Sequence, residues 1–367
     1  MTTVVLVGAG HAHLAIAKNA DKFTKQGVRL LLVDAGQFWY SGLATGMLGG
    51  MYDKAEDQVD PERLIVASGG EFLRDKVVGA DVKQQVLRLA SGKTLAYDIV
   101  SFNIGSQIDA GLAAERDNVW TVKPISELWR LRQKLEARFT ERNSRRIVVI
   151  GGGPTGSEIA ANLAALAQRH HSRLAITLVS ADARLISQNA PGAAKRLAKT
   201  LMHRGIHINY QRRVTTIEDG QVVIAGGETF AFDDLILATG LVAKPLVCEL
   251  GLPCDKSAGL TVTEQLHSIA DPRVFAAGDC ADIQGHPLPK LGVFGVRAAP
   301  ILCHNLLAAA CGEPLKSYRP QRIYLAILNL GDGTGLATWG PLWWQGKVSL
   351  WLKDWIDRRF LNTYRQA

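Results

Sequence analysis

Two glycine-rich turns, each placed between a short apolar strand and a helix, constrain the fold of this chain more than any other feature. The first turn begins at Gly8, directly after the apolar run Val4–Val7, and the second begins at Gly151, directly after residues 146–150. Strand, glycine turn and helix, in that order, form the unit with which parallel-sheet proteins bind dinucleotides. The recurrence therefore predicts two dinucleotide-binding units in tandem.

The first unit carries most of the dinucleotide fingerprint. Gly8 permits a tight turn, and Gly10 lets the backbone approach a pyrophosphate that rests on the helix N-terminus. The next apolar strand, Leu30–Val33, ends in Asp34, where an acid can accept both ribose hydroxyls of an adenosine. His13 stands where the third glycine is usual, so we expect the helix to pack less closely on the strand than in the standard fingerprint.

The second unit carries the full three-glycine spacing in Gly151, Gly153 and Gly156. Its next strand ends in Ser180 instead of an acid, and Arg184 lies nearby. An acid at this position favours NADH, whereas its absence beside an arginine tolerates the 2′-phosphate of NADPH. The sequence therefore leaves the choice between NADH and NADPH open.

Three further segments end in small residues at positions where a parallel sheet binds its ligands. Residues 102–106 and 235–240 are predicted buried strands that end near Gly105 and Gly240. Residues 273–281 contain a third predicted strand with Gly278 and Asp279 at its tip. The acid at its tip is well placed to hold a polyol such as the ribityl chain of a flavin.

Four motifs, at residues 7–10, 151–158, 238–240 and 276–281, resemble in this order the pyridine nucleotide-disulfide oxidoreductase superfamily, which comprises flavoproteins with two dinucleotide-binding domains. The resemblance covers residues 1 to about 320 and implies that the first turn binds FAD, the second binds NADH or NADPH, and Asp279 contacts the ribityl chain. The implied cofactor contacts are Gly8, Gly10, His11, Asp34, Gly105, Gly240, Gly278 and Asp279 in the flavin unit, and Gly151, Gly153, Gly156 and Ser180 in the nicotinamide unit.

Within the superfamily, residues 10–13, 40–43, 289–294 and 351–358 look like those of type II NADH dehydrogenases, especially the subgroup found alone or joined to selenophosphate synthetase. This likeness implies an NAD(P)H dehydrogenase that passes two electrons through FAD to a quinone. The alternative is a flavin-binding accessory protein, for example in selenium metabolism, with little turnover of its own. An assay of NADH and NADPH oxidation with a soluble quinone separates the two hypotheses.

The positions of the cysteines narrow the mechanism. Disulfide reductases of this superfamily carry a redox cysteine pair shortly after the first ribose acid, and residues 34–73 contain no cysteine. A thiol relay is thereby excluded, and sulfide:quinone oxidoreductases, which also need flavin-side cysteines, remain a weak alternative. Cys248 and Cys254 lie around Pro253 in a predicted surface connection, where we expect packed free thiols. The five cysteines show no zinc spacing, so no metal is predicted.

Two side chains are candidates for a direct part in catalysis. Lys290 precedes a predicted helix at residues 292–307, and the ammonium and the helix N-terminus would together stabilise the negative charge of reduced flavin. By resemblance, Glu158 lies near the nicotinamide. His11 and His13 share one turn without a third ligand, which favours packing or hydrogen bonding over metal binding or proton transfer.

Composition limits the partners and the compartment. Lys and Arg exceed Asp and Glu by 42 to 34, a mild excess that suits phosphate groups or an anionic surface but is not gathered into any run of like charges. Nucleic acid binding is therefore not predicted. The N-terminus lacks a basic signal-peptide region and no long apolar stretch is uninterrupted, so we expect a cytoplasmic protein without a membrane-spanning helix.

The C-terminal segment differs in composition, because five of the eight tryptophans fall within residues 339–355. On a helical wheel three of these tryptophans and two aliphatic residues form a stripe with basic residues at its borders, a pattern typical of helices that lie in a membrane interface. Burial of this stripe on the flavin domain, or on a second subunit of a homodimer, is the slightly favoured alternative. The stripe consists of Trp344, Val348, Trp351, Leu352 and Trp355.

Together these features predict an α/β protein with two Rossmann-like domains. The FAD-binding domain is expected to be discontinuous, formed by residues 1–109 and 232–330. It encloses an NAD(P)H-binding domain at residues 110–231 and is followed by a tryptophan-rich appendage at residues 331–367.

Overall fold

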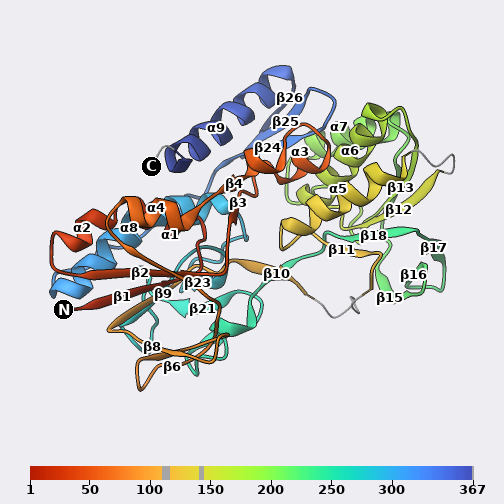
Figure 1. The fold of residues 1–367 in the computed structure, drawn as a ribbon. Coiled ribbons are helices and arrows are strands. Elements are labelled where there is room, and N and C mark those ends of the chain that lie inside the picture. The colour runs from red at the N-terminus through yellow and green to blue at the C-terminus, as the bar shows by residue number, and fades with distance from the viewer. Residues whose placement is uncertain (110–115, 140–143, 366–367) are drawn as a thin grey trace.

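The computed structural model describes residues 1–109, 116–139 and 144–365. Two parallel five-stranded sheets form its two units, and the C-terminal segment lies above both of them (Figure 1). Parallel sheets joined by helical crossovers define the Rossmann-like architecture. The predicted α/β fold class with two such units is therefore confirmed.

The first unit is built on a parallel sheet in which β1, the strand before the first glycine turn, lies at the centre. Helices lie above this sheet in Figure 1, and a small antiparallel sheet lies below it. Because both faces are covered, its strands are continuous apolar runs. The strands, in sheet order, are β22 (Val274–Ala276), β9 (Ile99–Phe102), β1 (Thr3–Val7), β2 (Arg29–Asp34) and β5 (Glu71–Arg74). The helices are α1 (His11–Ala17), α2 (Ala20–Thr24), α4 (Pro61–Ala67) and α8 (Gly292–Cys311), and the small sheet contains β6 (Val77–Asp81), β7 (Val86–Leu89) and β8 (Thr94–Ala96).

The second unit repeats the plan around β12, the strand before the second glycine turn. One of its strands comes from beyond the predicted boundary at residues 231 and 232, because β18 pairs with β12 and not with the first sheet. We therefore place the return to the first unit after Leu237. The strands, in sheet order, are β11 (Val119–Thr121), β18 (Asp234–Leu237), β12 (Arg145–Ile150), β13 (Leu174–Val179) and β14 (His207–Asn209). The helices are α5 (Ser126–Arg138), α6 (Pro154–Arg169) and α7 (Pro191–His203), with a hairpin sheet of β15 (Val214–Glu218), β16 (Gln221–Ile224) and β17 (Thr229–Ala231).

Two antiparallel connecting strands, β10 (Ser106–Ile108) and β19 (Leu241–Ala243), join the units. The other predicted boundary, at residues 109 and 110, adjoins residues outside the described part of the chain. After β19, Cys248 and Cys254 form a disulfide with their Cα atoms 5.2 Å apart, which corrects the expectation of free thiols. The short loop around Pro253 brings the two Cα atoms within bridging distance. The chain then forms β20 (Cys254–Asp255), β21 (Gly259–Val262) and β23 (Ala281–Ile283).

The C-terminal segment is a three-stranded antiparallel sheet followed by one helix, and not a single amphipathic helix. Trp339, Trp343 and Trp344 therefore lie on strands, while Trp351 and Trp355 lie on the helix. The expected burial of the stripe on the flavin domain is wrong, because Val348, Trp351 and Trp355 are exposed while the opposite helix face packs inward. The elements are β24 (Leu325–Asn329), β25 (Gly335–Trp339), β26 (Leu342–Gly346) and α9 (Lys347–Arg365).

Among the described residues, α8 is the one helix whose length and composition would allow it to cross a membrane. It packs along α1 in the first unit and buries Phe294, Ala298, Leu302 and Leu306. These contacts identify α8 as a core helix of the first unit.

Candidate functional site

The side chain of Asn103, directly after β9, packs against the first glycine turn. Gly8 adopts a left-handed backbone conformation with a φ of 85°, and a Cβ on Gly10 would lie 2.3 Å from Oδ1 of Asn103. This same oxygen accepts hydrogen bonds from the backbone N–H groups of Ala12 and His13 at 2.9 and 3.3 Å. Asn103 thus holds the N-terminus of α1, and glycine is required at position 10 because the two segments are in direct contact.

The ends of the first strands carry the other predicted groups. Asp34 accepts hydrogen bonds from the backbone of Ala9 at 2.7 Å and of Gly36 at 2.9 Å, which fixes its carboxylate beside the glycine turn. The ring of His13 contacts the carbonyl oxygen of Gly8 at 2.6 Å and the hydroxyl of Ser101 at 2.8 Å. Burial lowers the pKa of His13 to about 3, so this ring is a neutral structural group.

His11 lies at the start of α1, and its buried Nε2 has no hydrogen-bond partner. Its ring is surrounded by Phe38, Tyr40 and Phe360 at centroid distances of 5.1 to 5.7 Å. Burial lowers its pKa to about 4. An orphaned neutral imidazole beside a glycine turn fits a polar group of a bound cofactor.

Asp279 forms a compact polar cluster with Ser106 and Lys123. Its carboxylate accepts hydrogen bonds from the hydroxyl of Ser106 and the ammonium of Lys123, both at 2.6 Å. Burial raises the pKa of Asp279, but Lys123 outweighs it, so the pKa lies below its ordinary value. Gly105 and Gly278 lie beside this cluster in left-handed conformations, and the Cβ position of Gly105 is open. A polyol could exchange hydrogen bonds with this cluster.

Lys290 is held by the same cluster as Asp279. Its Nζ donates to the carbonyl oxygens of Asp279 at 2.5 Å and Ala258 at 2.7 Å. Burial lowers its pKa. The next helix, α8, begins at Gly292, where the sequence predicted it. The geometry leaves the proposed flavin-stabilising role of Lys290 open.

At the second glycine turn, Gly156 is in close contact with its surroundings, whereas Gly153 faces open space. A Cβ on Gly156 would lie 2.0 Å from the carbonyl oxygen of Gly151, so this glycine allows α6 to pack on β12. At Gly153, in contrast, no atom lies within 4 Å of the Cβ position, and Pro154 begins the helix. The N-terminus of α6 therefore presents open space in which a pyrophosphate fits.

The residues expected to distinguish NADH from NADPH lie at the end of β13. Ser180 is buried, and its Oγ accepts a hydrogen bond from the backbone of Asp182 at 3.2 Å. The guanidinium of Arg184 donates to the carbonyl oxygens of Ser187 and Asn189 at 2.6 and 3.3 Å. Gly240, beyond β18, is exposed, with open space at its Cβ position.

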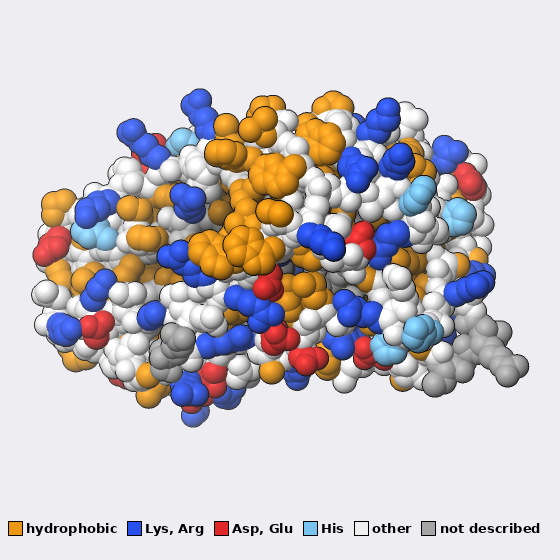
Figure 2. All heavy atoms as spheres, turned by 90° about the horizontal axis from the view of Figure 1, so that it is seen from above, with side chains coloured by type: hydrophobic (Ala, Val, Ile, Leu, Met, Phe, Trp, Pro, Cys, Tyr) orange, Lys and Arg blue, Asp and Glu red, His pale blue; other side chains and the backbone are white. Residues whose placement is uncertain are grey.

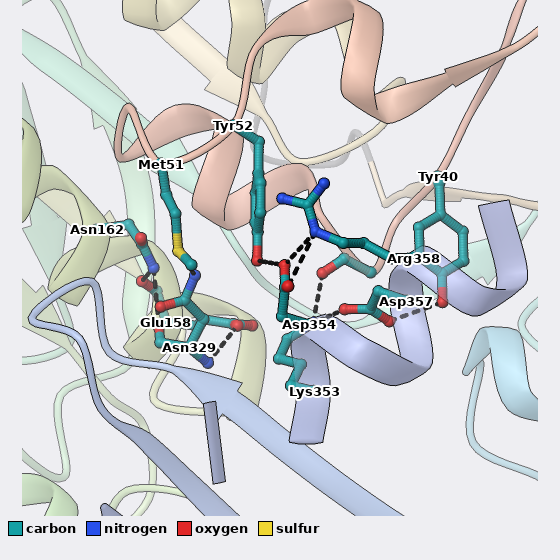
Figure 3. A network of polar contacts seen from close by, with 11 residues as sticks. Tyr40, Met51, Tyr52, Glu158, Asn162, Asn329, Lys353, Asp354, Asp357 and Arg358 are labelled. Carbon is teal, nitrogen blue, oxygen red and sulfur yellow. Dashed lines mark hydrogen bonds and ion pairs between the residues drawn. The ribbon is translucent and has the colours of Figure 1, made fainter. Parts of the chain in front are cut away.

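The two units meet where α3 (Ala44–Leu48), from the first unit, contacts α6 of the second. Glu158, on the first turns of α6, accepts a hydrogen bond from the backbone of Asn329 at 2.7 Å (Figure 3). Asn162 donates to the backbone oxygens of both Glu158 and Asn329 at 2.9 Å. Burial raises the pKa of Glu158 despite the opposing charge of Lys353. Glu158 thus joins the second unit to the C-terminal sheet at this junction.

Lys353 of α9 brings the C-terminal helix into the same junction. Its Nζ donates to the carbonyl oxygen of Gly42 at 2.5 Å and to Asp357 at 2.6 Å (Figure 3). Burial disfavours the charge on Lys353, but Asp357 and Glu158 outweigh it and raise the pKa. Tyr40 donates to the other oxygen of Asp357 at 2.9 Å. The junction therefore holds an ammonium beside two carboxylates.

The structure separates the two predicted catalytic residues: Lys290 belongs to the Asp279 cluster, and Glu158 belongs to the junction. Sequence analysis missed Asn103, Lys123 and Lys353. A spacing of four residues between Lys353 and Asp357, on a predicted helix, was the one available signal for the last of these.

Residues 2–300 match the model of the pyridine nucleotide-disulphide oxidoreductases, and the chain belongs to this family. The chain is 28% identical over 325 residues to a nitric oxide reductase FlRd-NAD(+) reductase of Vibrio vulnificus, covering 83% of this chain and 78% of the relative. It is 25% identical over 235 residues to the type II NADH:quinone oxidoreductase of Haemophilus influenzae, covering 59% and 53% of the two chains. The structure of the sulfide:quinone oxidoreductase of Aquifex aeolicus shares the fold, with a TM-score of 0.84 and 18% identity over 100% of this chain and 92% of that chain.

Membership of this family confirms the predicted cofactors, FAD and NAD(P)H. The side chains of the two turns fit these cofactors. The unpartnered imidazole of His11, the carboxylate of Asp34 and the hydrogen-bonding cluster around Asp279 suit FAD. The open helix end at Gly153 suits NAD(P)H. The chain is thus a flavoprotein of an oxidoreductase family.

Proposed function

We propose that this protein is an NAD(P)H dehydrogenase that passes two electrons through FAD to a quinone at a membrane surface. The observation that carries this proposal is the pair of Lys353 and Glu158 at the junction between the units. A quinone oxygen that receives electrons gains negative charge, and a buried ammonium stabilises this charge where water is scarce. The names of several relatives include quinone reduction, which supports this choice.

The free cysteines argue against a thiol acceptor. Among the described residues, α3 and the strands beside it contain no cysteine. Cys280 lies next to the Asp279 cluster, but burial raises the pKa of its thiol and disfavours the reactive thiolate. The sulfide:quinone alternative therefore has little support.

The residues of this chain have distinct roles in the proposed reaction. Bound FAD supplies the chemistry that accepts a hydride and releases two electrons singly or together. Asn103 fixes the helix that carries the first turn, and Asp279 with Lys123 orients a polyol. Glu158 fastens the nicotinamide unit to β24 of the C-terminal sheet, and Lys353 supplies a positive charge to the acceptor.

A contiguous set of exposed apolar side chains on the C-terminal segment supports a membrane surface as the place of action. Figure 2 shows these side chains gathered on one face, with Lys and Arg at the rim. Lys18, Arg358 and Arg359 line a surface hollow beside Trp351 and Trp355. Tryptophan with flanking cations is the composition of helices that lie in the interface of anionic bilayers. We call this set the tryptophan face; it comprises Trp339, Leu342, Trp343, Trp344, Val348, Trp351, Trp355 and Ile356.

The first experiment measures NADH and NADPH oxidation with a soluble quinone. Wild type should turn over, and Lys353→Met should lower quinone-dependent turnover by about 10²-fold because the positive charge that stabilises the reduced acceptor is lost. Lys93→Met, a change at an exposed lysine, serves as the control. Absence of turnover by wild type with either coenzyme would favour the accessory role instead.

The second experiment tests the tryptophan face with liposomes that contain anionic lipid. Trp351→Ser combined with Trp355→Ser should abolish co-sedimentation while turnover with a soluble quinone is kept. Val78→Ser, an exposed apolar change on β6, is the control. A dimer that dissociates in the double variant, without liposome binding by wild type, would show that the face is a subunit interface.

A further inference from the structure

The surface hollow beside the tryptophan face lies between the end of α1 and the outer face of α9. Its volume is about 540 Å³, and it is open to solvent. Trp351, Trp355 and Arg359 follow one another at intervals of four residues, so they stand on successive turns of α9 along one wall. Lys18, the residue that follows α1, lines the hollow from the first unit.

One of the three cations that line the hollow is neutralised by acids of the protein. The guanidinium of Arg358 donates to Asp354 at 2.9 and 3.0 Å and to Glu56 at 3.2 Å. Asp354 also accepts a hydrogen bond from the hydroxyl of Tyr52 at 2.9 Å, and no other described residue of the lining carries a carboxylate. Arg358 therefore fastens α9 to the first unit and is not available to a ligand.

The other two cations, Lys18 and Arg359, are exposed, and neither is paired with an acid in the part of the chain that the structure describes. The ammonium of Lys18 donates to the carbonyl oxygen of Thr363 at 2.6 Å, which holds it at the edge of the hollow. The guanidinium of Arg359 lies over the ring of Trp355, 5.4 Å from its centroid. A stacked guanidinium can still donate hydrogen bonds from its edges. The hollow thus presents two unpaired positive charges beside two exposed indole rings.

The chemistry of a phospholipid matches this arrangement. The two unesterified oxygens of its phosphate share one negative charge and accept hydrogen bonds from an ammonium and a guanidinium. Its acyl chains are apolar and suit the indole rings, as in helices that lie in a bilayer interface. A headgroup with an ammonium of its own would add a third positive charge to the two that are unpaired here. An anionic headgroup is therefore favoured over a zwitterionic one.

We propose that the hollow is a binding site for one anionic phospholipid, with Lys18 and Arg359 as the ligands of its phosphate. Trp351 and Trp355 contact the apolar part of the same lipid. This inference rests on the proposed membrane surface and names the class of lipid that the surface recognises. It differs from general attraction to an anionic bilayer, because it requires a stoichiometric complex with a single lipid molecule.

Short-chain lipids below their micelle concentration test the site without a membrane. Titration calorimetry of the FAD-loaded protein with dihexanoyl phosphatidylglycerol should give one site per chain, and dihexanoyl phosphatidylcholine should bind at least about tenfold more weakly. Lys18→Gln combined with Arg359→Gln should weaken phosphatidylglycerol binding by at least about tenfold, because the charge-assisted hydrogen bonds to the phosphate are lost. FAD content and the denaturation midpoint report whether the variant is folded.

The matched control is Lys347→Gln. Lys347 is an exposed cation next to Val348 of the tryptophan face, and it does not line the hollow. This variant should bind the short-chain lipid as wild type does. Equal binding of the two lipids by wild type, or equal weakening by Lys347→Gln, would overturn the proposal. Inorganic phosphate that binds as tightly as the lipid and is lost in the same double variant would show a site for free phosphate, which would overturn it as well.

Liposomes separate this proposal from the proposed function. The Lys18 and Arg359 double variant should bind phosphatidylglycerol liposomes at least about tenfold more weakly than Lys347→Gln does, although each removes charge beside the same face. Co-sedimentation of the double variant equal to that of wild type would refute the lipid site and leave the tryptophan face standing. Wild type that binds the short-chain lipid but no liposomes would refute the membrane surface and leave the lipid site standing.

Discussion

The two glycine turns share a backbone plan but differ in how the protein encloses them. At the first turn, Asn103 fills the space beside Gly10 and binds the N-terminus of α1. At the second turn, the space beside Gly153 is open, and Gly156 allows α6 to pack closely on β12. A closed turn suits a cofactor that stays bound, and an open turn suits a substrate that must leave after each hydride transfer. We therefore propose that the first turn holds the permanently bound FAD and that the second turn holds the exchangeable NAD(P)H.

The third fingerprint position shows the same contrast. His13 fills it in the first unit and forms contacts with Gly8 and Ser101, whereas Gly156 leaves no side chain in the second. The expectation of looser helix packing at His13 thus misses the contribution of its hydrogen bonds, which fasten α1 to the sheet.

The largest effect is expected from Gly10→Ala. The new Cβ would lie 2.3 Å from Oδ1 of Asn103 and 2.4 Å from its backbone oxygen, so Asn103 must release α1. The purified variant should contain little FAD by absorbance, while Gly153→Ala, with open space, should stay fully yellow. Equal FAD content in the two variants would show that the contact between Gly10 and Asn103 does not determine FAD binding.

Gly156→Ala should destabilise the second unit by about 1–3 kcal/mol, because its Cβ would lie 2.0 Å from the carbonyl oxygen of Gly151. FAD content should be retained, since the first turn is untouched, and the KM for NAD(P)H should rise. Chemical denaturation and steady-state kinetics measure the two effects. Loss of FAD without a change in KM would show that the turns are not independent.

His13→Ala should destabilise the protein by about 1–3 kcal/mol at pH 7 through the loss of two buried hydrogen bonds. The folded pKa of about 3 lies below the ordinary value, so the wild type loses stability as pH falls below about 6.5. The variant lacks this loss, and its deficit should therefore shrink by about 2 kcal/mol at pH 5. A deficit that is constant with pH would mean that His13 has the same pKa in the folded and unfolded states.

The smallest effect is expected from Ser180→Glu, which should shift coenzyme use toward NADH by about tenfold, or about 1.4 kcal/mol. A carboxylate at the end of β13 accepts ribose hydroxyls and repels a 2′-phosphate. Ala225→Glu adds the same charge elsewhere in the second unit. If the ratio of NADH to NADPH efficiency moves equally in both variants, Ser180 does not face the adenosine ribose.

The sequence predicted those features of the structure that neighbouring residues determine. The glycine turns, the apolar strands and the acids at Asp34 and Asp279 follow from backbone conformation and strand length, which neighbouring residues determine. Lys123 and Lys353 act on groups far along the chain, and no local pattern indicates their partners. The helical wheel places Trp344 on the same helix as Trp351 and Trp355 because the apolar spacing suits one, whereas Trp344 lies on β26, which pairs with β25.

The C-terminal segment is fastened to both units at once. Gln345 of β26 accepts a hydrogen bond from Arg196 of α7 at 2.9 Å, and α9 reaches Tyr52 of the first unit through Asp354 at 2.9 Å. Chains with two units can melt in two steps when few contacts cross between the units. Here neither unit can unfold without releasing the segment that also contacts the other. We therefore expect that the last forty or so residues help to make denaturation a single cooperative event.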